Sequence, residues 1–217
     1  MSEYDVARFN MVESQIRPNQ VTDEHLLRAL SEIPRERFVP ASLQALAYME
    51  EDIEVAPSRR LLAPMPLARL IQLAAVRPGD LVLDVGCATG YSTAILARLA
   101  ESVVGLEMDE RLADQASQDL VELEIDNAAI VLGPLPEGYP SEGPFDVILM
   151  NGCVPAVPQS LLDQLKDRGR LVTILAEHEF GRAYLYSKNG ARVSHRPAFD
   201  AGGPQLPGFT QEKEFVF

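Results

Sequence analysis

The sequence predicts an α/β fold in which helices cover both faces of a doubly wound, mostly parallel sheet. Apolar segments of strand length alternate with helical patterns from residue 81 to residue 175, the order expected of βαβ units. The first segment, LVLDVG (81–86), is apolar on both faces, like a parallel strand lying between two helical layers. Further along, Asn189-Gly190 separates two strand-like runs in 183–196, which predicts an antiparallel hairpin at the C-terminal edge of the sheet.

The N-terminal part, residues 1–76, is predicted to be a helical segment. One helix begins after Thr22, whose side chain is a suitable N-cap, and ends at Pro34, while a second runs from Pro66 to Val76. In the α/β core, residues 77–217, the predicted strands are 81–86, 102–107, 128–132, 145–151 and 170–175, and the predicted helices are 92–100, 110–123 and 158–167, the last ending at Gly169. The segment 212–217 is compatible with one more strand. We therefore expect a single Rossmann-like domain.

Composition and charge exclude several classes of protein. The net charge of −13 disfavours binding to nucleic acid, because such a surface repels phosphate backbones. No apolar run is long enough to cross a membrane, and the N-terminus lacks the pattern of a secretory signal, so we expect a cytoplasmic protein. Cys87 and Cys153 are expected to be free thiols, and the spacing of Cys and His residues indicates no metal site.

Small residues recur at alternate positions after the first core strand. Gly86 permits a sharp turn from strand to helix, and Ala88 and Gly90 leave room for a ligand near the start of the helix. The alternative is a tight turn that binds nothing. Glu107 ends the next strand, 21 residues after Gly86, where a carboxylate can accept hydrogen bonds from both hydroxyls of a ribose; the alternative is a solvated acid. Together these features predict a ligand that contains a ribose.

The spacing favours S-adenosyl-L-methionine over a dinucleotide. The pyrophosphate motif G-x-G-x-x-G would place glycines where this chain has Ala88 and Tyr91. Asp84 would repel a pyrophosphate, but it can face the amino group of a methionine moiety. The predicted cofactor-binding residues are Asp84, Gly86, Cys87, Ala88, Gly90, Glu107, Met108, Leu135 and Asn151, although the side chain of Cys87 is expected only to pack.

Several segments resemble, in order, those of the protein-L-isoaspartate O-methyltransferase family, a group of class I methyltransferases. They are LSEIPRERFVPASLQALAYMEEDIEV (30–55), VLDVGCATGYSTAILA (82–97), PFDVILMNG (144–152) and VPQSLLDQLKDRGRLV (157–172). The resemblance implies an enzyme that uses S-adenosyl-L-methionine to methylate the α-carboxylate of isoaspartyl residues in damaged proteins. It implies that proteins or peptides with such residues are the substrates, and that repair follows from collapse of the ester to a succinimide.

The chain departs from the family pattern in the loop before residue 64. Aligned on Pro64, Leu62 stands where the family has a serine whose hydroxyl lies beside the reacting carboxylate. Leucine offers no hydrogen bond, so that role cannot be transferred and no catalytic residue is assigned; core packing is the simpler interpretation of Leu62. Arg59 and Arg60 are candidates for binding the substrate carboxylate, although they are also compatible with solvated surface residues.

Two further positions differ. Pro134 stands where the family has an acid near the adenine, and proline supplies neither an acceptor side chain nor a backbone donor, so Leu132 and Leu135 are the remaining candidates for enclosing the ring. Asn151 ends a predicted strand at the edge where ligands bind, so its amide is a candidate for contact with the cofactor or the acceptor; the alternative is a turn residue before Gly152.

The leading hypothesis is therefore a divergent isoaspartyl O-methyltransferase. A methyltransferase with another acceptor is the first alternative, because fold and cofactor do not fix the substrate. A catalytically silent module that binds nucleosides is the second, and both alternatives are motivated by Leu62 and Pro134. A dehydrogenase comes last because the glycine spacing is wrong for a dinucleotide.

Overall fold

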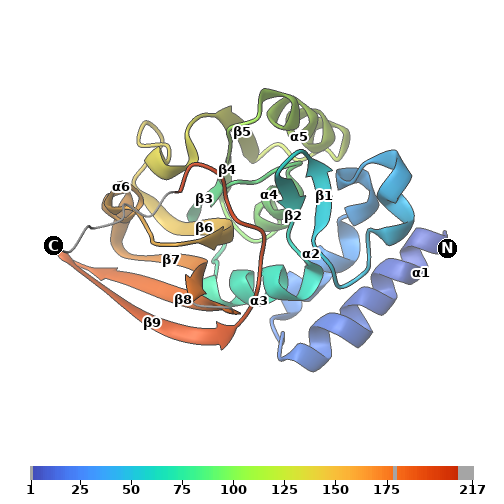
Figure 1. Ribbon diagram of the computed structural model, residues 1–217, viewed down its shortest axis with the longest axis horizontal. Helices are drawn as coiled ribbons and strands as arrows, with labels where there is room; N and C mark the ends of the chain where they lie inside the picture. Colours follow the sequence, from blue (N-terminus) through green and yellow to red (C-terminus); the bar gives the residue numbers. More distant parts are fainter. Residues whose placement is uncertain (1, 178–179, 210–217) are drawn as a thin grey trace, which may run out of the picture.

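A computed structural model describes residues 2–177 and 180–209 of the 217-residue chain. Its centre is a seven-stranded sheet with the strand order β5-β4-β3-β6-β7-β8-β9 (Figure 1). The strands from β5 to β7 are parallel, and β8 and β9 are antiparallel to their neighbours. The prediction of a mostly parallel sheet with an antiparallel C-terminal edge is confirmed. The strands are β3 (Leu81–Val85), β4 (Ser102–Glu107), β5 (Ala128–Leu132), β6 (Phe145–Val154), β7 (Leu165–Glu177), β8 (Phe180–Asn189) and β9 (Arg192–Asp200).

Helices cover both faces of this sheet. The α-helices are α1 (Glu3–Asn10), α2 (Glu24–Glu32), α3 (Pro64–Ala74), α4 (Tyr91–Ala97), α5 (Glu110–Glu122) and α6 (Gln159–Asp163). Shorter 3-10 or π segments lie at Met11–Ile16, Arg17–Asn19, Arg35–Phe38, Ala41–Leu46 and Leu135–Glu137. None of the helices in these described ranges is long and apolar enough to cross a membrane.

Two apolar clusters hold the layers together. The first joins residues of the N-terminal segment, such as Ile16 and Leu30, to α3, α4 and one face of the sheet, including Val82. The second lies on the opposite face and includes Leu83 and Leu161 of α6. Successive strand residues alternate between the two clusters, which explains why LVLDVG is apolar on both faces.

The N-terminal segment is not wholly helical. Residues 53–61 form a two-stranded antiparallel hairpin of β1 (Ile53–Ala56) and β2 (Arg59–Leu61). The hairpin interrupts a stretch that the sequence analysis assigned to helices. Its strands are so short that no alternation of apolar and polar residues distinguishes them from a loop.

Several predicted boundaries were wrong. The helix predicted at 92–100 ends at Ala97, and the strand predicted at 145–151 continues to Val154. Asp23, not Thr22, caps α2, because its carboxylate accepts hydrogen bonds from two backbone N–H groups of the first turn. The helix predicted at 158–167 ends at Asp163, and Gly169 is not its cap, because Leu165 already pairs with Phe145 as the start of β7. The helix predicted at 66–76 lies two residues earlier, at Pro64–Ala74.

After β9 the chain turns back across the carboxyl ends of β3 and β6, and we call residues 201–206 the strap (Figure 1, red). Backbone hydrogen bonds fix it to β6: Cys153 N donates to Pro204 O at 2.7 Å, and Leu206 N donates to Cys153 O at 2.9 Å. The side chain of Leu206 is buried and lies against Gly86. The strap therefore covers the edge at which the sequence predicts a ligand. The additional strand considered for 212–217 falls outside the described residues.

Candidate cofactor site

The turn after β3 is built on left-handed backbone. Gly86, Ala88 and Gly90 have φ values of +76°, +53° and +89°. Only glycine adopts this region without strain, which explains the glycines, and Ala88 carries the smallest possible side chain. Two hydrogen bonds fix the loop to the end of β4. Gly86 N donates to Leu106 O at 2.8 Å, and Ala88 N donates to a carboxylate oxygen of Glu107 at 2.8 Å.

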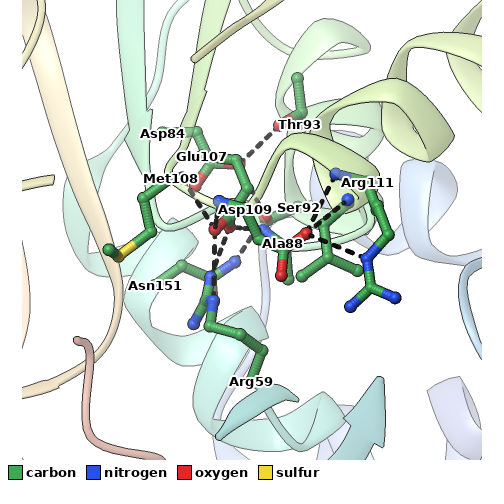
Figure 2. A network of polar contacts seen from close by, with 11 residues as sticks. Arg59, Asp84, Ala88, Ser92, Thr93, Glu107, Met108, Asp109, Arg111 and Asn151 are labelled. Carbon is green, nitrogen blue, oxygen red and sulfur yellow. Dashed lines mark hydrogen bonds and ion pairs between the residues drawn. The ribbon is translucent and has the colours of Figure 1, made fainter. Parts of the chain in front are cut away.

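Glu107 is fully buried, and five contacts satisfy its carboxylate (Figure 2). Oε1 accepts from the backbone N–H groups of Met108 (2.9 Å) and Asp109 (3.2 Å), and Oε2 accepts from that of Ala88. Arg59, from β2, supplies the other two contacts, with Nη2 at 2.5 Å from Oε2 and Nε at 3.3 Å from Oε1. Arg59 is itself only 3% exposed, so this is a buried ion pair.

A second polar cluster lies beside the glycine loop (Figure 2). The Oδ2 atom of Asp84 accepts hydrogen bonds from Ser92 Oγ at 2.6 Å and from Thr93 Oγ1 at 2.7 Å. Asn151 joins the cluster by donating from Nδ2 to Ser92 Oγ at 2.5 Å. Two buried acceptors, Asp84 Oδ1 and Asn151 Oδ1, have no hydrogen-bond partner. Buried polar atoms are rarely left unpaired, so these two oxygens mark where a ligand with donor groups would fit.

Burial controls the protonation of two side chains here. The pKa of Asp84 is raised to about 6, because burial disfavours the carboxylate more than the hydroxyl groups of Ser92 and Thr93 favour it. Burial also raises the pKa of the Cys87 thiol well above its usual value. Cys87 is therefore a packed, protonated thiol rather than a nucleophile.

Asp84 should make stability depend on pH. Because its folded pKa lies above the unfolded value, the folded state holds the extra proton between about pH 4 and about pH 6, and stability falls as pH rises through that window. Asp84→Asn should therefore raise the free energy of unfolding at about pH 8, by up to about 3 kcal/mol, and change it little at about pH 4. Urea denaturation of both proteins across this range measures the difference. A gain of equal size at every pH would contradict the raised pKa.

The remaining predicted site residues lie around this centre. Leu62 is 1% exposed and belongs to the first apolar cluster, which agrees with core packing. Leu135 is fully buried and lies near the Cα of Gly86, whereas Leu132 and Met108 are about half exposed. Arg60 points away from the site, at 3.5 Å from Glu54 on the surface.

Asn151 is not a turn residue. β6 continues through it to Val154, with a register shift between Leu149 and Cys153. The alternative interpretation, an Asn-Gly turn, was wrong, because the strap pairs with this end of β6 and extends it. The side chain of Asn151 is 3% exposed and lies within the polar cluster.

The sequence analysis missed three contributors: Ser92, Thr93 and Leu206. A signal existed for the first two, because hydroxyl residues in the first turn of a helix face the end of the preceding strand. No local signal marks Leu206, which reaches the glycine loop only through the fold. Within the described ranges, no group of His, Cys, Asp and Glu side chains could hold a metal ion.

These residues fit S-adenosyl-L-methionine in part. The two unpaired acceptors suit its amino group, and the loop around Gly86 and Gly90 carries little side-chain bulk. Glu107 is the residue predicted to bind a ribose, but its carboxylate is engaged by Arg59 and by three backbone N–H groups. A Cβ placed on Gly86 would lie 2.6 Å from a methyl of Leu206, so the strap also fills part of this space.

Comparison with known sequences identifies relatives over most of the chain. The model of the protein-L-isoaspartate(D-aspartate) O-methyltransferase family matches residues 7–199. A protein-L-isoaspartate O-methyltransferase of Methanoculleus marisnigri is 35% identical over 190 residues, which are 88% of this chain and 86% of that protein. The enzyme of the same name from Herpetosiphon aurantiacus is 31% identical over 216 residues, 95% of this chain and 96% of that protein.

Solved structures show the same fold. A structure described as a protein-L-isoaspartate O-methyltransferase superposes with a TM-score of 0.81 at 23% identity, covering 94% of this chain and 66% of that one. A Plasmodium falciparum protein described in the same way, in complex with S-adenosyl-L-homocysteine, gives a TM-score of 0.78 at 20% identity, covering 96% of this chain and all of that one.

Proposed function

Because the chain belongs to the protein-L-isoaspartate(D-aspartate) O-methyltransferase family and is an S-adenosylmethionine-dependent methyltransferase, we propose that it methylates the α-carboxylate of isoaspartyl residues in proteins. The observation that carries this proposal is the arrangement of Asp84 and Glu107, buried on either side of the glycine loop at the carboxyl edge of the sheet. The family supplies the acceptor, and the site geometry supports the cofactor.

The cofactor would be held by groups at two places. Asp84 and Asn151 would accept hydrogen bonds from the amino group through the oxygens that now lack partners. The carboxylate of Glu107 would accept the two ribose hydroxyls, provided that Arg59 leaves it. The glycine loop would lie against the ligand with little side-chain bulk between them.

S-adenosyl-L-methionine would supply a methyl group on a sulfonium, which a carboxylate oxygen can attack while the carbon–sulfur electron pair returns to sulfur. An acceptor α-carboxylate is ionised at neutral pH, so the protein needs no general base. Its own contribution is to align the two reactants and to exclude water. Leu135 and Leu206 are buried apolar side chains next to the loop, and Leu62 is buried near Gly203 of the strap, so all three are suited to the second task.

A methyl-transfer assay tests the proposal. The intact protein, given radiolabelled cofactor, should methylate a peptide containing isoaspartate and leave the same peptide with normal aspartate unlabelled. Binding of S-adenosyl-L-homocysteine is measured in parallel by calorimetry. If S-adenosyl-L-homocysteine binds and neither peptide is labelled, the proposed acceptor is wrong although the proposed cofactor is right.

Leu62→Ser separates packing from chemistry. The substitution removes a buried side chain and should lower the free energy of unfolding by about 2–5 kcal/mol, as large-to-small changes in cores do. Activity of the folded fraction should stay within about tenfold of the wild type, because the ionised acceptor needs no hydroxyl. Urea denaturation and the peptide assay at low temperature measure the two effects.

Leu46→Ser is the matched control, since Leu46 is 45% exposed and should tolerate the change. A large gain in activity from Leu62→Ser would show that the hydroxyl is needed after all. Such a gain would favour a methyltransferase whose natural acceptor differs, for which the buried Leu62 is the supporting observation.

A further inference from the structure

Glu107 is saturated in this structure. A carboxylate offers about four lone-pair sites, and five N–H contacts already converge on this one. A ribose diol would have to donate two hydrogen bonds to the same oxygens. At least one existing partner must therefore leave before a nucleoside can bind as proposed.

Only Arg59 is free to leave. The other three donors are backbone N–H groups of Ala88, Met108 and Asp109, which are fixed by the glycine loop and by the start of α5. Arg59 comes from a different element, the short hairpin of β1 and β2, and reaches Glu107 through a long side chain. Figure 2 shows the side chain of Arg59 and the backbone of Ala88 both reaching the carboxylate of Glu107.

Three local features of the hairpin favour a displacement of Arg59. Ser58, directly before Arg59, has a φ of +61°, a left-handed conformation that costs energy for a residue other than glycine. The β1–β2 pairing is irregular between Glu54 and Ala56. Residues 55–57 also line a cleft of about 410 Å³ whose other walls include Thr89 and the start of α5, so the turn is not packed on that side.

Arg59 also has one N–H donor group without a hydrogen-bond partner. Its Nη1 atom is buried and has no hydrogen-bond partner, although Nε and Nη2 are occupied. A buried guanidinium with one unpaired donor is suited to a carboxylate, which it binds with two parallel N–H groups. Once displaced from Glu107, the charge would need such a partner, because a buried unpaired charge is costly.

We propose that Arg59 is the residue that binds the acceptor's α-carboxylate. It stays paired with Glu107 until the ribose of the cofactor replaces it at that carboxylate. The inference rests on the proposed function. It means that the two substrates add in order, cofactor first. It also means that the negative charge of the acceptor is bound by an arginine, whereas the family pattern places a serine in this loop.

Calorimetry with S-adenosyl-L-homocysteine tests the first half without any acceptor. Arg59→Met keeps the methylene chain but removes the guanidinium that competes with the ribose for Glu107. S-adenosyl-L-homocysteine should therefore bind at least roughly tenfold more tightly. Arg60→Ala, at the neighbouring exposed position, should leave affinity unchanged. Unchanged or weakened binding in Arg59→Met would overturn the proposal, and weakened binding would show that Arg59 contacts the cofactor's own carboxylate.

Kinetics with the isoaspartyl peptide test the second half. Arg59→Met should raise the KM for the peptide roughly tenfold or more and change kcat less, and Arg59→Lys should restore part of the loss. Equal KM values for wild type and Arg59→Met would overturn the acceptor role. If the wild type does not methylate the peptide at all, the proposed function fails. The titration with S-adenosyl-L-homocysteine still reports whether Arg59 occupies the ribose position. Thermal melts confirm that each variant is folded.

Discussion

Glu107→Ala should lower the free energy of unfolding by about 3–5 kcal/mol, the range for removing one partner of a buried ion pair. The substitution leaves the Arg59 guanidinium buried without a countercharge, and it removes the acceptor from three backbone N–H groups that hold the glycine loop. Binding of S-adenosyl-L-homocysteine should be lost as well. Urea denaturation and calorimetry measure the two effects.

Glu54→Ala provides the matched control, because Glu54 is paired with Arg60 at 3.5 Å on the surface. Such an exposed pair should contribute less than about 1 kcal/mol. The double variant Arg59→Ala, Glu107→Ala should be less destabilised than the sum of the two single variants, since it leaves no lone charge. A small effect of Glu107→Ala, similar to that of Glu54→Ala, would contradict the buried ion pair.

Gly90→Val should cost about 2–6 kcal/mol and abolish cofactor binding. Gly90 is the N-cap of α4 and has a φ of +89°, which a β-branched residue adopts only with strain of about 1–3 kcal/mol. A Cβ at this position would also lie 3.0 Å from the Cβ of Ala116 on α5, and overpacking adds about 1–3 kcal/mol. Thermal or urea unfolding and calorimetry measure the losses.

Two controls separate the causes. Gly190→Val introduces the same residue at a φ of +58° with no atom within 4 Å of the new Cβ, so it reports the backbone strain alone. Cys87→Ala, within the loop, removes only packing atoms and should leave cofactor affinity nearly unchanged. Equal losses in Gly90→Val and Gly190→Val would show that the contact with α5 is unimportant.

The parts of the fold that were predicted correctly are those with local causes. The strands Ser102–Glu107 and Ala128–Leu132 match the predicted bounds, because short apolar runs differ clearly from the amphipathic helical patterns between them. The glycine turn and the Asn-Gly hairpin were recognisable for a similar reason, since their residues are selected by the backbone conformation itself.

The parts that were missed depend on distant partners. Arg59 was considered as a clamp for a substrate, but its pairing with Glu107 joins positions 48 residues apart and leaves no trace in the local pattern. β7 begins at Leu165 because this residue pairs with Phe145 of β6, although the local sequence pattern there is helical. Tertiary contacts override propensity in such places.

The strap has a consequence for how the protein forms during synthesis. Leu206 and Gly86 touch although roughly 120 residues separate them, and contacts of such range form late because a long loop must close first. A nascent chain that has been translated through β9 contains every strand of the described sheet, but its glycine loop still lacks this cover. A small ligand can therefore reach the glycine loop of the growing chain before the strap covers it.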